Sequence, residues 1–153
     1  MSLVLVLDVT LGPELLSSLG RPRAWQRGTP YQGRVITPRE QRAYQARVAA
    51  MCWEDRARRT GAMRPITGAI EVSVEAFYRR PKSGPHKKAA ACLVKPDVDN
   101  VAKTILDALQ KQAPAMGRLI EDDAQVVRLT AGKRWADPGR ERVEVRVWEV
   151  QGG

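Results

Sequence analysis

Residues 69–110 predict a strand, a basic loop and a helix in succession; their sequence is AIEVSVEAFYRRPKSGPHKKAAACLVKPDVDNVAKTILDALQ. In residues 69–78 apolar and polar side chains alternate, which is typical of a strand with one buried face. From Asp97 onward, apolar residues recur at three- and four-residue intervals as far as Leu109. This spacing predicts an amphipathic helix that ends before Pro114.

The flanking sequence extends this pattern in both directions. It predicts strands at 3–9, 124–134 and 142–150, a loop over 12–34, and a helix from Thr37 to about Arg59. The resulting order is strand, helix, strand, helix, strand, strand. This order predicts a single α+β domain over 1–153, with a mixed β-sheet of about four strands and two main helices packed on one face.

Composition narrows the class of protein. The 153 residues carry a formal net charge of +9, and arginine (19 residues) outnumbers lysine (7 residues). Because arginine pairs with phosphate through two parallel hydrogen bonds, this bias favours a nucleic-acid partner. The chain has no apolar run long enough to cross a membrane, no phosphate-binding loop of a nucleotide enzyme, and too few cysteines and histidines for a zinc site. We therefore expect a cytoplasmic protein without a nucleotide cofactor.

The charge is unevenly distributed along the chain. Residues 21–64 sum to +8 and residues 79–95 to +6, whereas residues 97–123 sum to −3. An acidic segment repels phosphate, so a protein that only holds DNA gains nothing from it. A protein that binds Mg²⁺ and then phosphate needs such a segment.

Four carboxylates and one lysine are the candidate chemical groups of this acidic segment. Asp97 and Asp99 lie at a helix start, and Asp122 and Asp123 precede a strand. They could hold Mg²⁺ for phosphodiester hydrolysis, or they could be helix caps and turn residues. Lys103, one turn after Asp99, could stabilise a scissile phosphate or belong to a surface ion-pair ladder.

Two blocks of sequence resemble a known family. KPDVDNVAKTILDAL (95–109), EDDAQVV (121–127) and then Lys133 are similar to the RusA-type Holliday junction resolvases. Weaker similarity extends upstream to RPR (21–23) and VITPREQRAY (35–44). The resemblance implies a small, dimeric, Mg²⁺-dependent endodeoxyribonuclease of a bacterium or phage, with an α+β fold.

The resemblance also implies a role at each matching position. Asp97, Asp99 and Asp123 match essential acids, Asp122 matches a neighbouring acid, and Lys103 matches a lysine required for cleavage. With Mg²⁺ as the cofactor, Mn²⁺ is a possible substitute. The basic segments predict a set of DNA contacts: Arg21, Arg23, Arg27, Arg79, Arg80, Lys82, Lys87, Lys88, Lys95 and Lys133.

The leading hypothesis is thus a structure-selective endonuclease that resolves four-way DNA junctions in recombination and repair, acting as a homodimer. Two alternatives are a Mg²⁺-dependent nuclease specific for flaps or other branched DNA, and a DNA-binding protein without catalysis. Trp25, in the arginine-rich segment, is predicted either to stack on an exposed base or to pack against the sheet.

Overall fold

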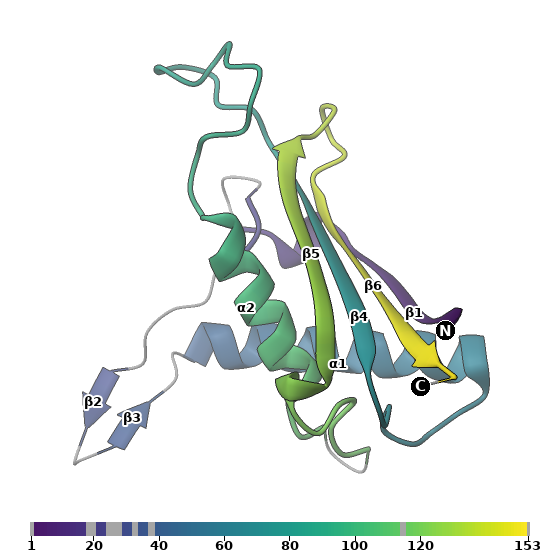
Figure 1. The fold of residues 1–153 in the computed structure, drawn as a ribbon. Helices are drawn as coiled ribbons and strands as arrows, with labels where there is room; N and C mark the ends of the chain where they lie inside the picture. The colour runs from purple at the N-terminus through teal and green to yellow at the C-terminus, as the bar shows by residue number, and fades with distance from the viewer. Residues whose placement is uncertain are drawn as a thin grey trace.

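A four-stranded mixed sheet forms the centre of the computed structural model of the protein (Figure 1). The structure describes residues 2–17, 21–23, 29–31, 34–36, 39–113 and 116–152. The strands are β1 (Ser2–Leu11), β4 (Ile70–Tyr78), β5 (Val126–Trp135) and β6 (Arg142–Gln151), in the spatial order β1-β6-β4-β5. β4 and β5 are parallel, and the other neighbours are antiparallel. The α+β fold with a mixed sheet, predicted from the sequence, is confirmed.

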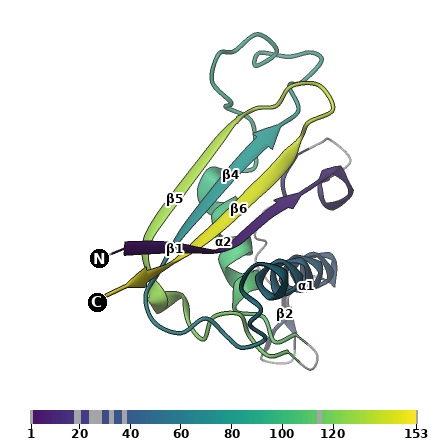
Figure 2. The same cartoon turned by 90° about the vertical axis from the view of Figure 1, so that its right-hand side faces the viewer.

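Two helices cover one face of this sheet (Figure 2). Helix α1 (Arg39–Thr60) packs on β1 and on helix α2 (Val98–Leu109), which connects β4 to β5. The predicted stripe of α2 is buried at Val101, Ile105 and Leu109, and it meets the alternating buried residues of β4. This burial places the apolar core between the sheet and the two helices. The predicted arrangement of both helices on one face is confirmed.

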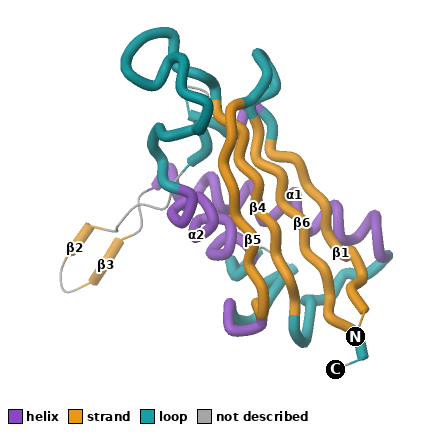
Figure 3. Tube along the Cα trace, turned by 45° about the horizontal axis from the view of Figure 1, so that its top comes forward, coloured by secondary structure: helices purple, strands orange, loops and turns teal. Residues whose placement is uncertain are grey.

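The segment predicted as a loop over 12–34 contains short elements. Its described residues include a 3₁₀ turn, η1 (Pro13–Leu15), and a strand, β2 (Thr29–Tyr31), that pairs antiparallel with β3 (Arg34–Ile36). Figure 3 shows this pair apart from the four-stranded sheet. The loop prediction was wrong here because strands of three residues are too short to show a period of two.

Two element boundaries show how local chemistry ends or starts a helix. Gly61 follows α1 with a φ of 70°, a conformation typical of a glycine that ends a helix, and its N–H donates to the Ala57 carbonyl. The predicted start at Thr37 lies outside the described residues. Strand β5 begins at Val126 rather than 124 because a 3₁₀ turn, η2 (Asp123–Gln125), precedes it.

The face of the sheet turned away from the helices carries paired charges. Arg128 pairs with Glu71 at 3.7 Å, and Arg134 with Glu75 at 3.5 Å. Because these arginines pair with glutamates, the net charge of the protein overstates the number of basic side chains available to contact DNA. Among the described residues, no helix is long and apolar enough to cross a membrane.

Asp55 is a buried carboxylate that ties α1 to β1. Its Oδ2 accepts a hydrogen bond from the Asp8 N–H at 2.8 Å, and its oxygens also accept from Arg58 at 3.0 Å and Arg59 at 3.2 Å. Burial alone would raise the pKa of Asp55, but these hydrogen bonds outweigh it and hold the pKa below its ordinary value.

We expect Asp55→Asn to lower the free energy of unfolding by about 1–3 kcal/mol near neutral pH, because an amide cannot serve three donors as the carboxylate does. A group with a lowered pKa stabilises the fold above its unfolded-state pKa, and this stabilisation is lost as pH falls through the folded-state pKa. Urea unfolding should therefore show the difference shrinking below about pH 4. The exposed turn substitution Asp137→Asn serves as the control. An undiminished difference in acid would contradict the assignment.

Candidate functional site

A groove of about 500 Å³ lies between helix α2 and strand β5. Its walls combine charged and apolar side chains: Val98, Asp99, Ala102, Lys103, Leu106, Asp107, Asp123, Leu129 and Ala131. Asp99, Lys103 and Asp107 are spaced four residues apart, so they project from one side of α2. Asp123 enters from η2, at the beginning of β5. The groove therefore gathers two carboxylates and a lysine from one side of α2 and a third carboxylate from η2.

Part of the helix-facing side of β5 is uncovered at the groove. Strand β5 is an edge of the sheet, and on its helix-facing side Leu129 is 44% exposed and Val127 62% exposed. Val127, Leu129 and Ala131 alternate along β5 and so share one side of the strand. Val72 and Val74, which pair with Leu129 and Ala131 in the neighbouring strand β4, are buried. In the single chain, the apolar side chains Val127 and Leu129 on the edge strand β5 are therefore not fully covered by another element of the described structure.

Asp107 lines the groove, although the sequence suggested for it only a place in a surface ion-pair ladder with Lys103. Burial raises the pKa of Asp107 above its ordinary value, the nearby Asp123 raises it further, and Lys103 opposes both effects. Asp107, Asp123 and Lys103 all line the same groove. The position of Asp107, eight residues after Asp99 and four after Lys103, was the signal that could have identified it.

Asp97 occupies the N-cap position of α2, as one interpretation of the sequence expected. Its carboxylate accepts no capping hydrogen bond, however, and pairs instead with the Lys95 ammonium at 3.1 Å. Both side chains are largely exposed, at 49% and 82%. The carboxylate of Asp97 is thus accessible to a ligand, although Asp97 does not line the groove.

Asp122 and Asp123 differ in their surroundings. Asp122 Oδ1 accepts a hydrogen bond from the Ala124 N–H at 2.8 Å, and Gln125 completes a capping box around η2. The Ala124 hydrogen bond, with a contribution from Asp123, lowers the pKa of Asp122. Asp122 therefore has a structural partner, as the turn interpretation expected, while Asp123 faces the groove.

The carboxylates are divided between the two ends of α2. Asp97 and Asp99 lie at its beginning, whereas Asp107 and Asp123 lie near its end. The eight residues from Asp99 to Asp107 span about 12 Å along the helix axis. Within the part of the chain that the structure describes, no three His, Cys, Asp or Glu side chains converge to hold a metal ion. Carboxylate oxygens suit a hard divalent cation, but one chain does not bring enough of them to one point.

Several basic residues predicted to contact DNA already have protein partners. Arg79 pairs with the buried Glu141 at 3.1 Å, and Arg80 and Lys133 donate hydrogen bonds to backbone carbonyls. Lys82, Lys87 and Lys88 are exposed on the loop that follows β4. Arg27 and Trp25 lie outside the described residues.

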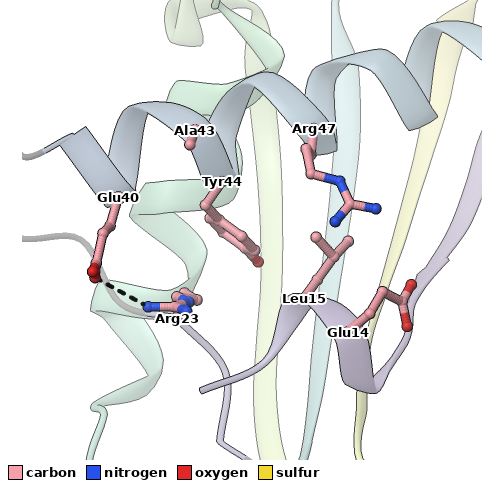
Figure 4. Close-up of a pocket in the computed structure, with 7 residues that line it drawn as sticks. All are labelled: Glu14, Leu15, Arg23, Glu40, Ala43, Tyr44 and Arg47. Atoms are coloured by element: carbon pink, nitrogen blue, oxygen red, sulfur yellow. Dashed lines mark ion pairs between the residues drawn. The ribbon is translucent and has the colours of Figure 1, made fainter. Parts of the chain in front are cut away.

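A second pocket, of about 220 Å³, lies between η1 and α1 (Figure 4). Arg23 pairs there with Glu40 at 3.6 Å, and Glu14 and Arg47 also line the pocket. Its two acidic and two basic side chains balance one another, and it contains none of the predicted catalytic residues. Arg21 lies nearby in sequence, and its Nε is buried without a hydrogen-bond partner.

The protein is basic and has an α+β fold with an acidic groove. These features indicate a candidate nuclease, an enzyme that hydrolyses phosphodiester bonds. The chain matches the family model described as Endodeoxyribonuclease RusA over residues 17–148, a range that contains every predicted catalytic residue. The chain therefore belongs to the RusA endodeoxyribonuclease family, whose members resolve Holliday junctions and are in general metal-dependent. No curated protein gives a significant sequence match to the chain.

Proposed function

We propose that this protein is a Mg²⁺-dependent endonuclease that resolves four-way DNA junctions during recombination and repair, and that Mn²⁺ substitutes for Mg²⁺. The observation that supports this most is the groove of Asp99, Lys103, Asp107 and Asp123 in a member of a junction-resolving family. In this proposal Asp97, Asp99 and Asp123 are metal ligands, and Asp122 holds the turn beside them. A bound divalent cation would activate water and stabilise the charge on the leaving oxygen.

Lys103 has a separate task in the proposed reaction. It lies one helical turn from Asp99 and one from Asp107, and it lines the same groove. An ammonium group held between carboxylates is well placed to receive a phosphate oxygen whose negative charge grows in the transition state. Lys103 is therefore proposed to bind the scissile phosphate.

The division of the carboxylates supports a homodimer. A two-fold axis that passes the groove perpendicular to α2 would set the α2 helices of two copies antiparallel, so that the beginning of one helix would face the end of the other. Asp97 and Asp99 of one copy would then approach Asp123 of the second copy. The exposed Val127 and Leu129 supply an apolar surface for such an association, and β5, as the edge strand of the sheet, supplies backbone N–H and C=O groups.

The basic residues are proposed to hold the junction through its phosphates, without reading sequence. Lys82, Lys87 and Lys88 form an exposed arm on the loop after β4, and this arm contains no acid. The whole of 1–153 acts in this proposal as one domain, in the cytoplasm of a bacterium or of a phage-infected cell, where the DNA lies.

Cleavage of synthetic DNA tests the proposal. We expect the protein to cut a four-way junction in Mg²⁺, to lose this activity in EDTA, and to recover it when Mn²⁺ is added. Junction, flap, fork and linear duplex of matched sequence should be compared at equal occupancy, measured by gel shift in EDTA. Preferential cutting of flaps would replace the junction assignment, and tight binding with no cutting in either metal would leave a DNA-binding protein only.

A further inference from the structure

Residues 89–96, here called the strap, connect the exposed basic arm to the first acids of α2. The beginning of the strap is held by two side chains that donate to one carbonyl. Arg80 Nη1 and Trp135 Nε1 approach the Ala89 oxygen at 2.7 Å and 2.9 Å, and the Arg80 guanidinium lies 4.7 Å from the centre of the Trp135 ring. The strap is thereby fixed to the ends of strands β4 and β5.

The end of the strap is held by Lys133 and Tyr78. Lys133 Nζ donates to the Val94 carbonyl at 2.9 Å, and the Tyr78 hydroxyl donates to the Pro96 carbonyl at 2.6 Å. The two side chains also contact each other, with Lys133 Nζ 5.6 Å from the centre of the Tyr78 ring. Tyr78 is fully buried, and burial raises the pKa of its hydroxyl, which therefore keeps its proton.

These contacts end directly before Asp97. Pro96 is the residue whose carbonyl Tyr78 holds, and α2 begins one residue after Asp97, at Val98. Tyr78 and Lys133 belong to β4 and β5, two strands of the sheet. Their hydrogen bonds to the strap therefore restrain the backbone just before Asp97 and Asp99 relative to the sheet. Figure 1 shows the long loop that connects β4 to α2. Its lysines at 82, 87 and 88 are exposed, whereas the part next to the acids is held by Tyr78 and Lys133.

We propose that Tyr78 and Lys133 are positioning residues of the cleavage site, which fix the strap and so place Asp97 and Asp99. This inference rests on the proposed function and refines it, because it gives Lys133 a role other than a DNA contact. Lys133 is half-buried with its ammonium directed at the Val94 carbonyl, whereas Lys88 is exposed on the arm. The two lysines should therefore behave differently when each is replaced.

The salt dependence of junction binding distinguishes a phosphate contact from a positioning role. Losing one phosphate contact should reduce the slope of log K against log salt concentration by about 1. We expect Lys88→Met to reduce the slope in this way, and Lys133→Met to leave it unchanged while slowing single-turnover cleavage roughly 10-fold. A reduced slope for Lys133→Met with an unchanged cleavage rate of the bound junction would overturn the proposal.

A second pair of variants tests Tyr78. Tyr78→Phe and Tyr44→Phe each remove one hydroxyl from a buried tyrosine, but Tyr78 donates to the Pro96 carbonyl of the strap, whereas Tyr44 lines the pocket between η1 and α1. We expect Tyr78→Phe to slow cleavage by about 2- to 10-fold at unchanged junction affinity, the factor typical of one hydrogen bond. Hydrogen exchange of the backbone amides in residues 91–99 should accelerate in Tyr78→Phe and not in Tyr44→Phe.

The two proposals fail in different ways. If the wild-type protein cuts no branched DNA, the proposed function is wrong, yet the exchange rates and salt slopes still report whether Tyr78 and Lys133 fix the strap. If the wild-type protein cuts junctions and both variants cut at the wild-type rate with unchanged exchange, only the positioning role is wrong.

Discussion

Asp99→Asn is expected to reduce junction cleavage in Mg²⁺ by more than about 100-fold while leaving junction binding intact. Asp99 is the acid at the beginning of α2 that lines the groove. The amide keeps the size of the carboxylate but removes the charge that a divalent cation requires. DNA affinity should not fall, since removing a negative charge does not weaken attraction to phosphate.

This substitution separates chemistry from folding. Asp99 is exposed in the first turn of α2, where an acid interacts favourably with the helix dipole for at most about 1 kcal/mol. The variant should therefore unfold at nearly the wild-type temperature. Glu54→Gln, on the exposed side of α1, removes the same charge far from the groove and should cut at the wild-type rate. Undiminished cleavage by Asp99→Asn would show that Asp99 binds no essential metal ion.

The elements of the fold were predictable because their signals are local. The alternation in residues 70–78 and the stripe of Val101, Ile105 and Leu109 depend only on the period of a strand or a helix. The apolar side of β5 was equally visible in the sequence. Its partial exposure was not, because exposure depends on how far α2 reaches across the sheet.

The arrangement of the site was less predictable because it depends on long-range pairing. The parallel pairing of β4 and β5 obliges the connecting helix to run back along the sheet, so acids before α2 and acids before β5 reach opposite ends of the helix. The sequence left open whether Asp99 and Asp123 share a metal ion or serve as cap and turn residues, because their separation in space depends on this pairing. The partners of Lys133 and Arg80 were also hidden, because a backbone carbonyl has no sequence signature.

Two inactive variants, Asp99→Asn and Asp123→Asn, are expected to regain junction cleavage when their subunits are mixed. If each site combines Asp99 of one copy with Asp123 of the other, a mixed dimer has one site with both substitutions and one site with neither. Random exchange of equal amounts makes half of the dimers mixed, so about a quarter of the wild-type number of sites should be active. Each active mixed dimer should nick one strand rather than make paired incisions.

The double variant, Asp99→Asn with Asp123→Asn, gives the opposite expectation. When the double variant pairs with a wild-type subunit, it contributes one substituted residue to each shared site. Every mixed dimer should therefore be inactive, and an excess of the double variant should suppress wild-type cleavage. Sites contained within single chains would behave differently, because a wild-type subunit would keep its own site in any dimer. Formation of mixed dimers can be verified with two affinity tags. Two results together would show that both carboxylates of a site come from one chain. The mixed single variants would stay inactive, and the wild-type subunit would stay active when it is paired with the double variant.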